Sequence, residues 1–176
     1  MNRLFCLSLF LGIMFLGSSC SEKNKMEKQI ATLEKEIFSE TEQSVNLDKT
    51  AQLVDTYVAF ADTWPSEEKS PEYLFNAGNV AMNLLDPEKA ITLFDRIMKS
   101  YPAYEKIPQC LFLKAFIFEN QLNQLGKAEM LYREFLQNYP DHEFADDAEL
   151  SLKNLGKTPE ELLQQFEMTT TMDTTQ

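Results

Sequence analysis

The sequence predicts an all-α fold in which about three pairs of helices repeat along the chain. One observation is internal similarity: three ungapped segments share one order of residue types, and each ends in an aromatic–proline pair. A second observation is the spacing of the shared positions, in steps of four, three and four, which places them on one face of a helix. Proline pushes the preceding residue out of the α region, so each aromatic–proline pair is expected to end its helix. The segments are Leu53-x3-Tyr57-x2-Phe60-x3-Trp64-Pro65, Ala90-x3-Phe94-x2-Ile97-x3-Tyr101-Pro102 and Ala128-x3-Tyr132-x2-Phe135-x3-Tyr139-Pro140.

A second set of helices is expected between these segments. Residues 71–75 align with residues 108–112, and four further positions match in the two copies. The second copy carries one extra residue in the loop between its helices. The matched positions are Leu74, Ala77, Gly78 and Ala81 in the first copy, and Leu111, Lys114, Ala115 and Phe118 in the second. The repeating unit is therefore expected to be a pair of helices.

Local signals predict where several helices begin and end. Ser70 and Asp86 each precede a proline, so each is expected to cap a helix N-terminus. Residues 158–161, Thr-Pro-Glu-Glu, have the pattern of a capping box. Gly126 and Gly156 stand where helix C-caps are expected.

These motifs resemble a known repeat. Residues 74–102 resemble a full tetratricopeptide repeat (TPR), whose pattern pairs Trp-x2-Leu-Gly-x2-Tyr with Ala-x3-Phe and a final Pro, although this copy carries smaller residues at several positions. Residues 108–140 resemble a second repeat, and residues 46–65 the second helix of an earlier one. The resemblance covers roughly residues 46–156. It implies a right-handed TPR-type helical solenoid of about three helix pairs, in a domain that we place at residues 46–167.

The first residues have the features of a signal peptide, which we place at residues 1–19. Arg3 precedes an apolar run at residues 4–16, which is too short to span a bilayer. The end of the leader resembles a bacterial lipoprotein signal, except that Gly17 stands where Leu is usual. The resemblance implies a diacylglycerol thioether on Cys20, with or without an N-acyl chain, and no other cofactor is expected. The alternative is ordinary cleavage nearby, which would leave Cys20 as a free thiol.

Residues 20–45 are predicted to contain the lipidated Cys20, a short tether and an N-terminal amphipathic helix. Its apolar residues are spaced four, three and four, which fits two structures: a helix packed on the first repeat, or a coiled coil of about two heptads. The polar residues 168–176 are predicted to be a disordered tail. The apolar residues of the helix are Met26, Ile30, Leu33 and Ile37.

Composition argues against catalysis and against nucleic acid as a partner. The formal net charge of -12 should repel phosphate groups. The single histidine, His142, is interpreted as a solvated residue of a first helical turn, and Cys110 as a small buried residue of an apolar helix. The carboxylates around Asp146 lack the alternation and the Gly turn of a calcium loop. No zinc spacing, phosphate loop or nucleophile elbow is present, so no catalytic or metal-binding residue is predicted.

The most apolar helix indicates where a partner would bind. Residues 110–118 carry Lys114 as their only charge, whereas a surface helix should show a single apolar stripe. Either neighbouring repeats cover this helix on several sides, or part of it lines an open groove for a peptide. In TPR proteins the first helices of the repeats line the concave face, so that resemblance implies a groove there. The candidate groove residues are Phe75, Asn79, Met82, Phe112, Phe116 and Glu119.

These observations predict an interaction scaffold anchored in a bacterial envelope. The leader and repeats are similar to the TPR lipoprotein of the outer-membrane β-barrel assembly machine and to the Tol-Pal coordinator. The resemblance implies unidentified envelope proteins as partners. Ser21, where some inner-membrane lipoproteins carry Asp, favours the outer membrane, with the periplasmic or surface-facing side left open. The alternatives are a self-associating structural spacer and a glycan-binding protein; the oligomeric state is undetermined by the sequence.

Overall fold

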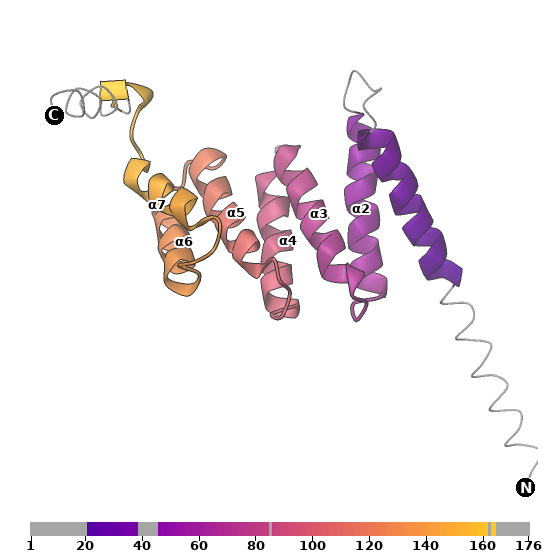
Figure 1. Cartoon of the computed structure of the whole chain (residues 1–176). Coiled ribbons are helices and arrows are strands. Elements are labelled where there is room, and N and C mark those ends of the chain that lie inside the picture. The colour runs from indigo at the N-terminus through magenta and orange to yellow at the C-terminus, as the bar shows by residue number, and fades with distance from the viewer. Residues whose placement is uncertain (1–20, 39–45, 85, 162, 165–176) are drawn as a thin grey trace, which may run out of the picture. The chain divides into compact units, whose positions relative to one another are not determined.

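The described residues of the chain are helical and contain no strand. The structure is a computed structural model that describes residues 21–38, 46–84, 86–161 and 163–164. Figure 1 shows the helices as coiled ribbons along the chain. They are residues 21–38, α2 (Leu47–Thr63), α3 (Lys69–Asn83), α4 (Pro87–Ser100), α5 (Ile107–Asn120), α6 (Leu125–Asn138), α7 (Ala145–Asn154) and the short segment at residues 159–161 and 163–164.

The chain divides into two compact units. The N-terminal unit spans Met1–Asp86, and its described part contains the helix at residues 21–38 together with α2 and α3. The C-terminal unit spans Pro87–Gln176 and contains α4 to α7. Within each unit, helices that follow one another in sequence pack together: α2 on α3 in the first, and α4 on α5, α5 on α6 and α6 on α7 in the second. This packing of consecutive helices confirms the predicted all-α, TPR-type fold class.

The helix at residues 21–38 is an integral part of the N-terminal unit and runs beside α2 (Figure 1). Its apolar positions face inward: the side chain of Ile30 is 1% exposed and that of Leu33 is 7% exposed. The Tyr57 hydroxyl of α2 donates a hydrogen bond of 2.6 Å to the Glu34 carboxylate of this helix. The apolar seam therefore packs on the first repeat, which is the first of the two structures that its spacing allowed. This helix is also the first member of the pair whose second member, α2, the sequence indicated.

The second helix of each pair buries the residues that the internal repeat identified. The aromatic and apolar positions, and the small or apolar positions before them, are all at most 2% exposed. Side chains in three successive pairs thus occupy equivalent core positions. Their burial is the main favourable contribution to the stability of each helix pair. These residues are Leu53, Tyr57 and Phe60 in α2, Ala90, Phe94 and Ile97 in α4, and Ala128, Tyr132 and Phe135 in α6.

The turns that follow these helices share one hydrogen-bond pattern. Each turn begins at the aromatic residue before the proline. The backbone amide three residues later donates to the carbonyl oxygen of that aromatic residue, and the amide three residues further on donates to the carbonyl oxygen of the first donor. The same sequence motif therefore builds the same turn in three places. The donor–acceptor pairs are Glu67–Trp64 (3.1 Å) and Ser70–Glu67 (3.0 Å), Tyr104–Tyr101 (2.9 Å) and Ile107–Tyr104 (3.2 Å), and His142–Tyr139 (3.2 Å) and Ala145–His142 (2.8 Å).

One buried cluster of the C-terminal unit is formed by α5 and α6 with a contribution from α7. Its buried residues are Leu111, Ala115, Ala128, Leu131, Tyr132, Phe135 and Ala148. Helix α4 adds the buried Ala90, Leu93, Phe94 and Ile97 to the core of the same unit. An ion pair between Lys114 of α5 and Asp95 of α4 also joins these two helices. Lys114 stands where the preceding repeat has Ala77.

Two of the predicted helix boundaries are wrong. Ser70 is not an N-cap, because α3 begins at Lys69. The Ser70 side chain is fully buried and its hydroxyl donates 2.6 Å to the Trp64 carbonyl oxygen, which stabilises the turn instead. Gly126 is not a C-cap, because it lies in the first turn of α6; the residue with positive φ in the preceding loop is Asn123, at 51°. Asparagine can adopt this left-handed conformation because its short polar side chain can form hydrogen bonds with the nearby backbone.

Other local predictions are confirmed. The capping box forms: the Thr158 amide donates to the Glu161 carboxylate at 2.8 Å, and the Glu161 amide donates to Thr158 Oγ1 at 3.3 Å. Gly156 follows α7 with φ of 75°, the left-handed conformation expected beyond a helix C-terminus. The loop between α5 and α6 is one residue longer than the loop between α3 and α4.

The predictions for residues 1–19, Cys20 and 168–176 lie outside the described residues. From the first described residue, Ser21, the chain is helical through residue 38, so the predicted short tether is not found within residues 21–38. In the part of the chain that the structure describes, no helix combines the length and apolar character needed to cross a bilayer.

Candidate partner-binding cleft

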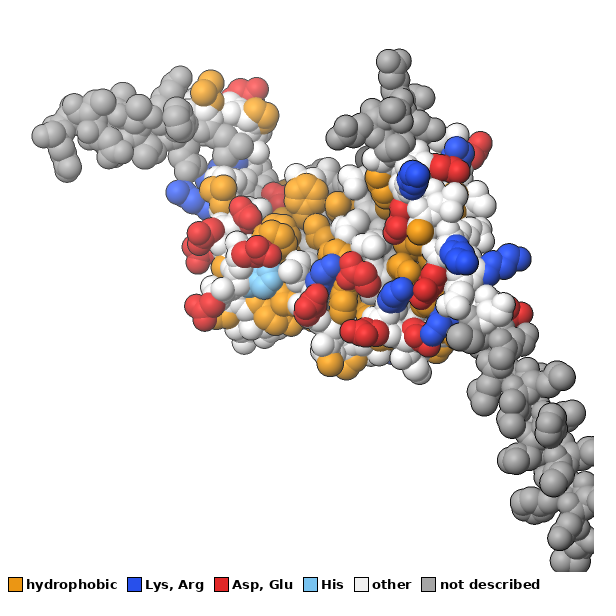
Figure 2. Space-filling view, turned by 45° about the vertical axis from the view of Figure 1, so that its right-hand side comes forward, with side chains coloured by type: hydrophobic (Ala, Val, Ile, Leu, Met, Phe, Trp, Pro, Cys, Tyr) orange, Lys and Arg blue, Asp and Glu red, His pale blue; other side chains and the backbone are white. Residues whose placement is uncertain are grey.

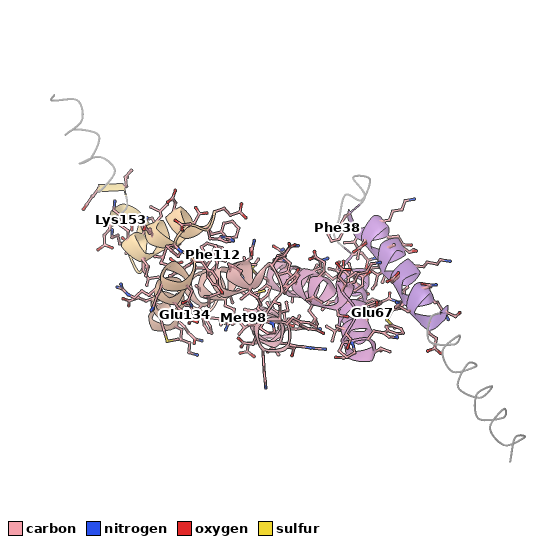
Figure 3. All side chains as sticks on the ribbon, turned by 60° about the horizontal axis from the view of Figure 1, so that its bottom comes forward. Phe38, Glu67, Met98, Phe112, Glu134 and Lys153 are labelled. Atoms are coloured by element: carbon pink, nitrogen blue, oxygen red, sulfur yellow. The ribbon has the colours of Figure 1, made fainter. Side chains whose placement is uncertain are left out.

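The N-terminal unit contains a cleft between the helix at residues 21–38 and α3. Its volume is about 670 Å³. Phe38, at the end of the first of these helices, is 64% exposed, and Figure 3 shows it projecting there. The lining combines carboxamide, charged and aromatic side chains, so it can contact both polar and apolar parts of a ligand. The lining residues are Ala31, Glu34, Lys35, Phe38, Tyr57, Asn76, Asn79, Val80 and Asn83.

Three asparagines of α3 form one row along the cleft. Asn76, Asn79 and Asn83 are separated by three and four residues, which places their side chains on one face of the helix. Each carboxamide offers one acceptor oxygen and two N–H donors. Asn83 uses one donor internally, in a bond of 2.9 Å from its Nδ2 to the Asn79 carbonyl oxygen. A row of carboxamides can pair with the alternating N–H and C=O groups of an extended peptide.

A buried tyrosine connects the cleft to the core. The Tyr57 side chain is 2% exposed, and its hydroxyl holds the Glu34 carboxylate at 2.6 Å. Burial, followed by the hydrogen bond and charge of Glu34, raises the pKa of Tyr57 well above its ordinary value. The tyrosine therefore remains protonated and donates to Glu34 throughout the physiological range. Glu34 is thereby fixed at one side of the cleft.

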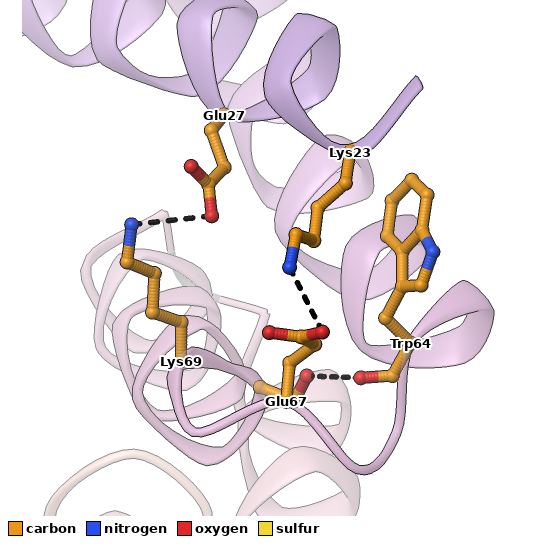
Figure 4. Close-up of polar contacts among 6 residues, drawn as sticks. Lys23, Glu27, Trp64, Glu67 and Lys69 are labelled. Atoms are coloured by element: carbon orange, nitrogen blue, oxygen red, sulfur yellow. Dashed lines mark hydrogen bonds and ion pairs between the residues drawn. The ribbon is translucent and has the colours of Figure 1, made fainter. Parts of the chain in front are cut away.

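Ion pairs tie the cleft's first helix to the rest of the unit. Lys49 of α2 lies 3.1 Å from Glu36, and Lys69 of α3 lies 3.1 Å from Glu27. A third pair joins Lys23 to Glu67 at 2.9 Å, and Figure 4 shows it beside the Lys69 pair. Because these side chains are partly solvent-exposed, each pair contributes little, on the order of 0–1 kcal/mol. Burial of the apolar seam therefore contributes most to holding the helix.

The residues predicted to form a groove divide between the two units. Phe75, Asn79 and Met82 lie on α3 of the N-terminal unit, and only Asn79 lines the cleft described above. Phe75 and Met82 are partly buried. The other three predicted residues lie on α5 of the C-terminal unit, so the prediction that all six form a single groove stays a prediction.

On α5 the three predicted residues have different surroundings. Phe112 packs on the core of its unit, with its ring centroid 4.9 Å from that of Phe144 and 5.7 Å from that of Tyr132. Phe116 is 38% exposed. Glu119 accepts a hydrogen bond of 2.8 Å from the Tyr132 hydroxyl. Phe112 thus contributes to packing within its unit, whereas Phe116 presents an apolar surface to solvent.

Sequence reasoning missed the contribution of the first helix to the cleft. Glu34, Lys35 and Phe38 lie in residues 20–45, which were assigned outside the repeat domain. A signal was available: the apolar spacing of four, three and four in this helix is also compatible with the first helix of a repeat.

Two residues of chemically reactive types outside the cleft, Cys110 and His142, are packed against the rest of the chain. Cys110 is fully buried, and burial raises its thiol pKa to about 12, as expected for a small core residue. His142 is not a solvated first-turn residue: it precedes α7, its ring lies 5.5 Å from that of Phe135, and its Nδ1 accepts from the Phe144 amide at 3.1 Å. Among the described residues, no group of three or more His, Cys, Asp or Glu side chains could hold a metal ion.

A second hollow, of about 520 Å³, is lined among the described residues by Asp146, Glu149, Leu150, Leu152 and Lys153, which all lie on α7. The cleft of the N-terminal unit is instead lined by described residues of three helices, so it is the better candidate site. On the face shown in Figure 2, acidic and basic side chains are interspersed over the surface.

Comparison with known proteins agrees with this architecture. Residues 72–104 and 109–142 match the tetratricopeptide repeat family. The first segment covers nearly all of α3 and α4, and the second covers most of α5 and α6. A search of curated proteins found no match to the chain. Proteins with this repeat are generally non-catalytic scaffolds for other proteins. The two matched segments, together with the repeated turns and buried positions, show that residues 72–104 and 109–142 carry tetratricopeptide repeats.

Proposed function

We propose that this protein is a membrane-anchored interaction scaffold of the bacterial envelope that holds an extended segment of a partner protein in the cleft of its N-terminal unit. The observation that carries the proposal is the cleft itself. It has two helical walls, a volume of about 670 Å³ and a row of asparagines along one side. The repeat family supports protein–protein interaction as the general function.

The lining indicates the chemistry of the partner segment. The carboxamides of Asn76 and Asn79 can bind backbone N–H and C=O groups, which every extended peptide offers. Phe38 provides an apolar surface at one end, and Lys35 a cation. A partner segment with an apolar side chain near an acidic one would match these groups. Glu34 is already bound by Tyr57 and would mainly exclude acidic side chains from that side.

The membrane anchor is the second part of the proposal. Its support is the resemblance of residues 1–20 to a lipoprotein signal, which implies acylation of Cys20. Two or three acyl chains would anchor the protein durably, because each buried CH₂ contributes about 0.8 kcal/mol. We place the protein at the outer membrane on the evidence of Ser21. Envelope proteins are then the partners within its reach.

Self-association as a structural spacer has less support. A coiled coil would need the seam of residues 21–38 to face another chain. Ile30 and Leu33 of that seam are instead buried within the N-terminal unit. The crosslinking experiment described next would detect self-association as adducts between copies of the chain.

The test is site-specific photo-crosslinking in intact cells. A photoreactive residue replaces Asn83, an exposed residue that lines the cleft, and a matched control replaces Gln52, an exposed residue of α2 outside the cleft. We expect the probe at position 83 to capture a specific envelope protein that the probe at position 52 does not capture. Asn79→Asp keeps the side-chain shape but removes two N–H donors, so it should reduce that capture several-fold. Equal capture at both positions, or capture unaffected by Asn79→Asp, would contradict the proposed cleft. Adducts between copies of the chain would favour the spacer.

A further inference from the structure

We infer that one end of the N-terminal unit, formed by the first turns of the helix at residues 21–28 and by the turn at residues 64–69, is the surface that rests on the lipid bilayer. The inference rests on the proposed anchor at Cys20 and goes further by assigning the orientation of the protein. It makes Trp64 a membrane-surface contact and directs the cleft away from the membrane.

The first argument is the absence of a tether between the anchor and the folded unit. The described chain is helical from Ser21, the residue after Cys20, and the apolar seam of this helix is buried in the unit. An acylated Cys20 would therefore hold the first helical turn within a few ångströms of the headgroups. A flexible linker, by contrast, would allow any face of the unit to approach the bilayer.

The second argument is that the turn after α2 lies against this first helical turn. Lys23 Nζ is 2.9 Å from Glu67 Oε1, and the Glu67 amide donates 3.1 Å to the Trp64 carbonyl oxygen. Lys69 at the end of the turn is paired with Glu27, one turn further along the helix. Figure 4 shows Trp64, Glu67 and Lys23 together at this end of the unit. Whatever holds Ser21 at the bilayer therefore holds Trp64 there as well.

The third argument is the composition of this end. The chain as a whole has a net charge of -12, and such a surface is repelled by anionic lipid. Residues 21–28 and 64–69 carry four lysines and four glutamates, so this end is locally neutral. Trp64 is the only tryptophan of the chain, and tryptophan, like lysine, is favoured at the interface between membrane and water. The acidic surplus of the chain thus comes from residues outside these two segments.

The orientation has a consequence for the cleft. Phe38 is seventeen residues along the helix from Ser21, which at 1.5 Å per residue is about 26 Å. That separation exceeds the Debye length of about 8 Å at physiological ionic strength, so the Phe38 end of the cleft lies beyond the electrostatic influence of the headgroups. A partner in the aqueous compartment can then reach it.

The test measures the depth of a single tryptophan. Full-length acylated protein is reconstituted in vesicles of phosphatidylethanolamine and phosphatidylglycerol, with and without brominated phosphatidylcholine, which quenches nearby indole fluorescence. The matched control, Trp64→Phe with Phe38→Trp, moves the only indole to the opposite end of the helix. Circular dichroism checks that both proteins are folded. We expect quenching of Trp64 to be several-fold stronger than quenching of the indole at position 38.

Co-flotation of the protein with the vesicles separates the possible outcomes. Protein that floats, with Trp64 quenched no more than the control indole, would overturn the orientation and leave the anchor in place. Protein that does not float would overturn the anchor and the orientation with it. A second comparison uses the unmodified tryptophan: if Cys20→Ser protein in solution with the same vesicles shows quenching equal to that of the acylated protein, the anchor does not set the position of Trp64.

Discussion

Replacing Ile30 with alanine tests whether residues 21–38 are an integral helix of the N-terminal unit. The Ile30 side chain is 1% exposed, so the substitution removes buried methyl and methylene groups and leaves a cavity. Such substitutions cost about 2–5 kcal/mol. With a loss of about 3 kcal/mol and a urea dependence of about 2 kcal/mol per molar, the unfolding midpoint should fall by about 1.5 M.

The assay is urea unfolding followed by the fluorescence of Trp64. This tryptophan lies in the N-terminal unit, 5.1 Å from the ring of Phe60, so it reports unfolding of that unit even if the C-terminal unit unfolds separately. The control is Gln29→Ala on the exposed side of the same helix, which should change the free energy of unfolding by no more than about 0.5 kcal/mol.

Equal midpoints for Ile30→Ala and Gln29→Ala would refute the packing of this helix. A midpoint that rises with protein concentration would instead indicate that the helix is stabilised by a second chain. The structure predicts neither result, because the apolar seam of the helix at residues 21–38 is covered by residues of the same unit.

Three further predictions concern single groups in the core and the loops. Cys110, whose pKa is raised to about 12 by burial, should react with a disulfide-exchange reagent at pH 8 only when the protein unfolds. The measurement uses a variant in which Cys6 and Cys20 are replaced by serine, and rapid reaction of the folded protein would contradict the burial of Cys110. Alanine at Gly126 and at Gly156 should have opposite effects on the free energy of unfolding, measured by thermal denaturation. At Gly126, inside α6 with nothing within 4 Å of an added Cβ, alanine should add about 0.5 kcal/mol to the free energy of unfolding. At Gly156, where φ is 75° and an added Cβ would lie 3.1 Å from Leu125 Cδ1, alanine should cost about 1 kcal/mol. Effects of the same sign would refute this prediction. Burial raises the pKa of Tyr57 and of Tyr132, so the stability that they contribute is complete below pH about 10 and is lost as the pH rises above that unfolded-state value. Ultraviolet titration of tyrosinate alongside circular dichroism should show these two tyrosines ionising only as the helices unfold, and their ionisation with the fold intact would contradict the prediction.

The sequence alone determined the repeating unit of this protein. Steps of four, three and four before an aromatic–proline pair identified the buried face of α2, α4 and α6, because a regular helix converts residue spacing directly into direction around its axis. The aromatic–proline pairs located the ends of the same helices. The capping box at residues 158–161 and the turn at Gly156 were also readable, since both depend on residues close together in the sequence.

Local patterns failed where tertiary contacts compete with them. Ser70 has the sequence of an N-cap, but its buried hydroxyl bonds to the Trp64 carbonyl oxygen instead. His142 has the sequence of a solvated residue, but the ring of Phe135 lies 5.5 Å from its own. In both cases a partner several residues away decided the outcome.

The candidate site was only partly predictable for the same reason. Asn79 could be placed on the exposed side of α3 from its spacing, and it does line the cleft. Glu34, Lys35 and Phe38 could not, because the seam of their helix fitted both packing on the first repeat, which the sequence favoured, and a coiled coil. Burial of Ile30 and Leu33 within the N-terminal unit decided between the two. Helical periodicity fixes which face of a helix is apolar, whereas the surface that covers that face depends on contacts between segments distant in sequence, and only the tertiary structure supplies those.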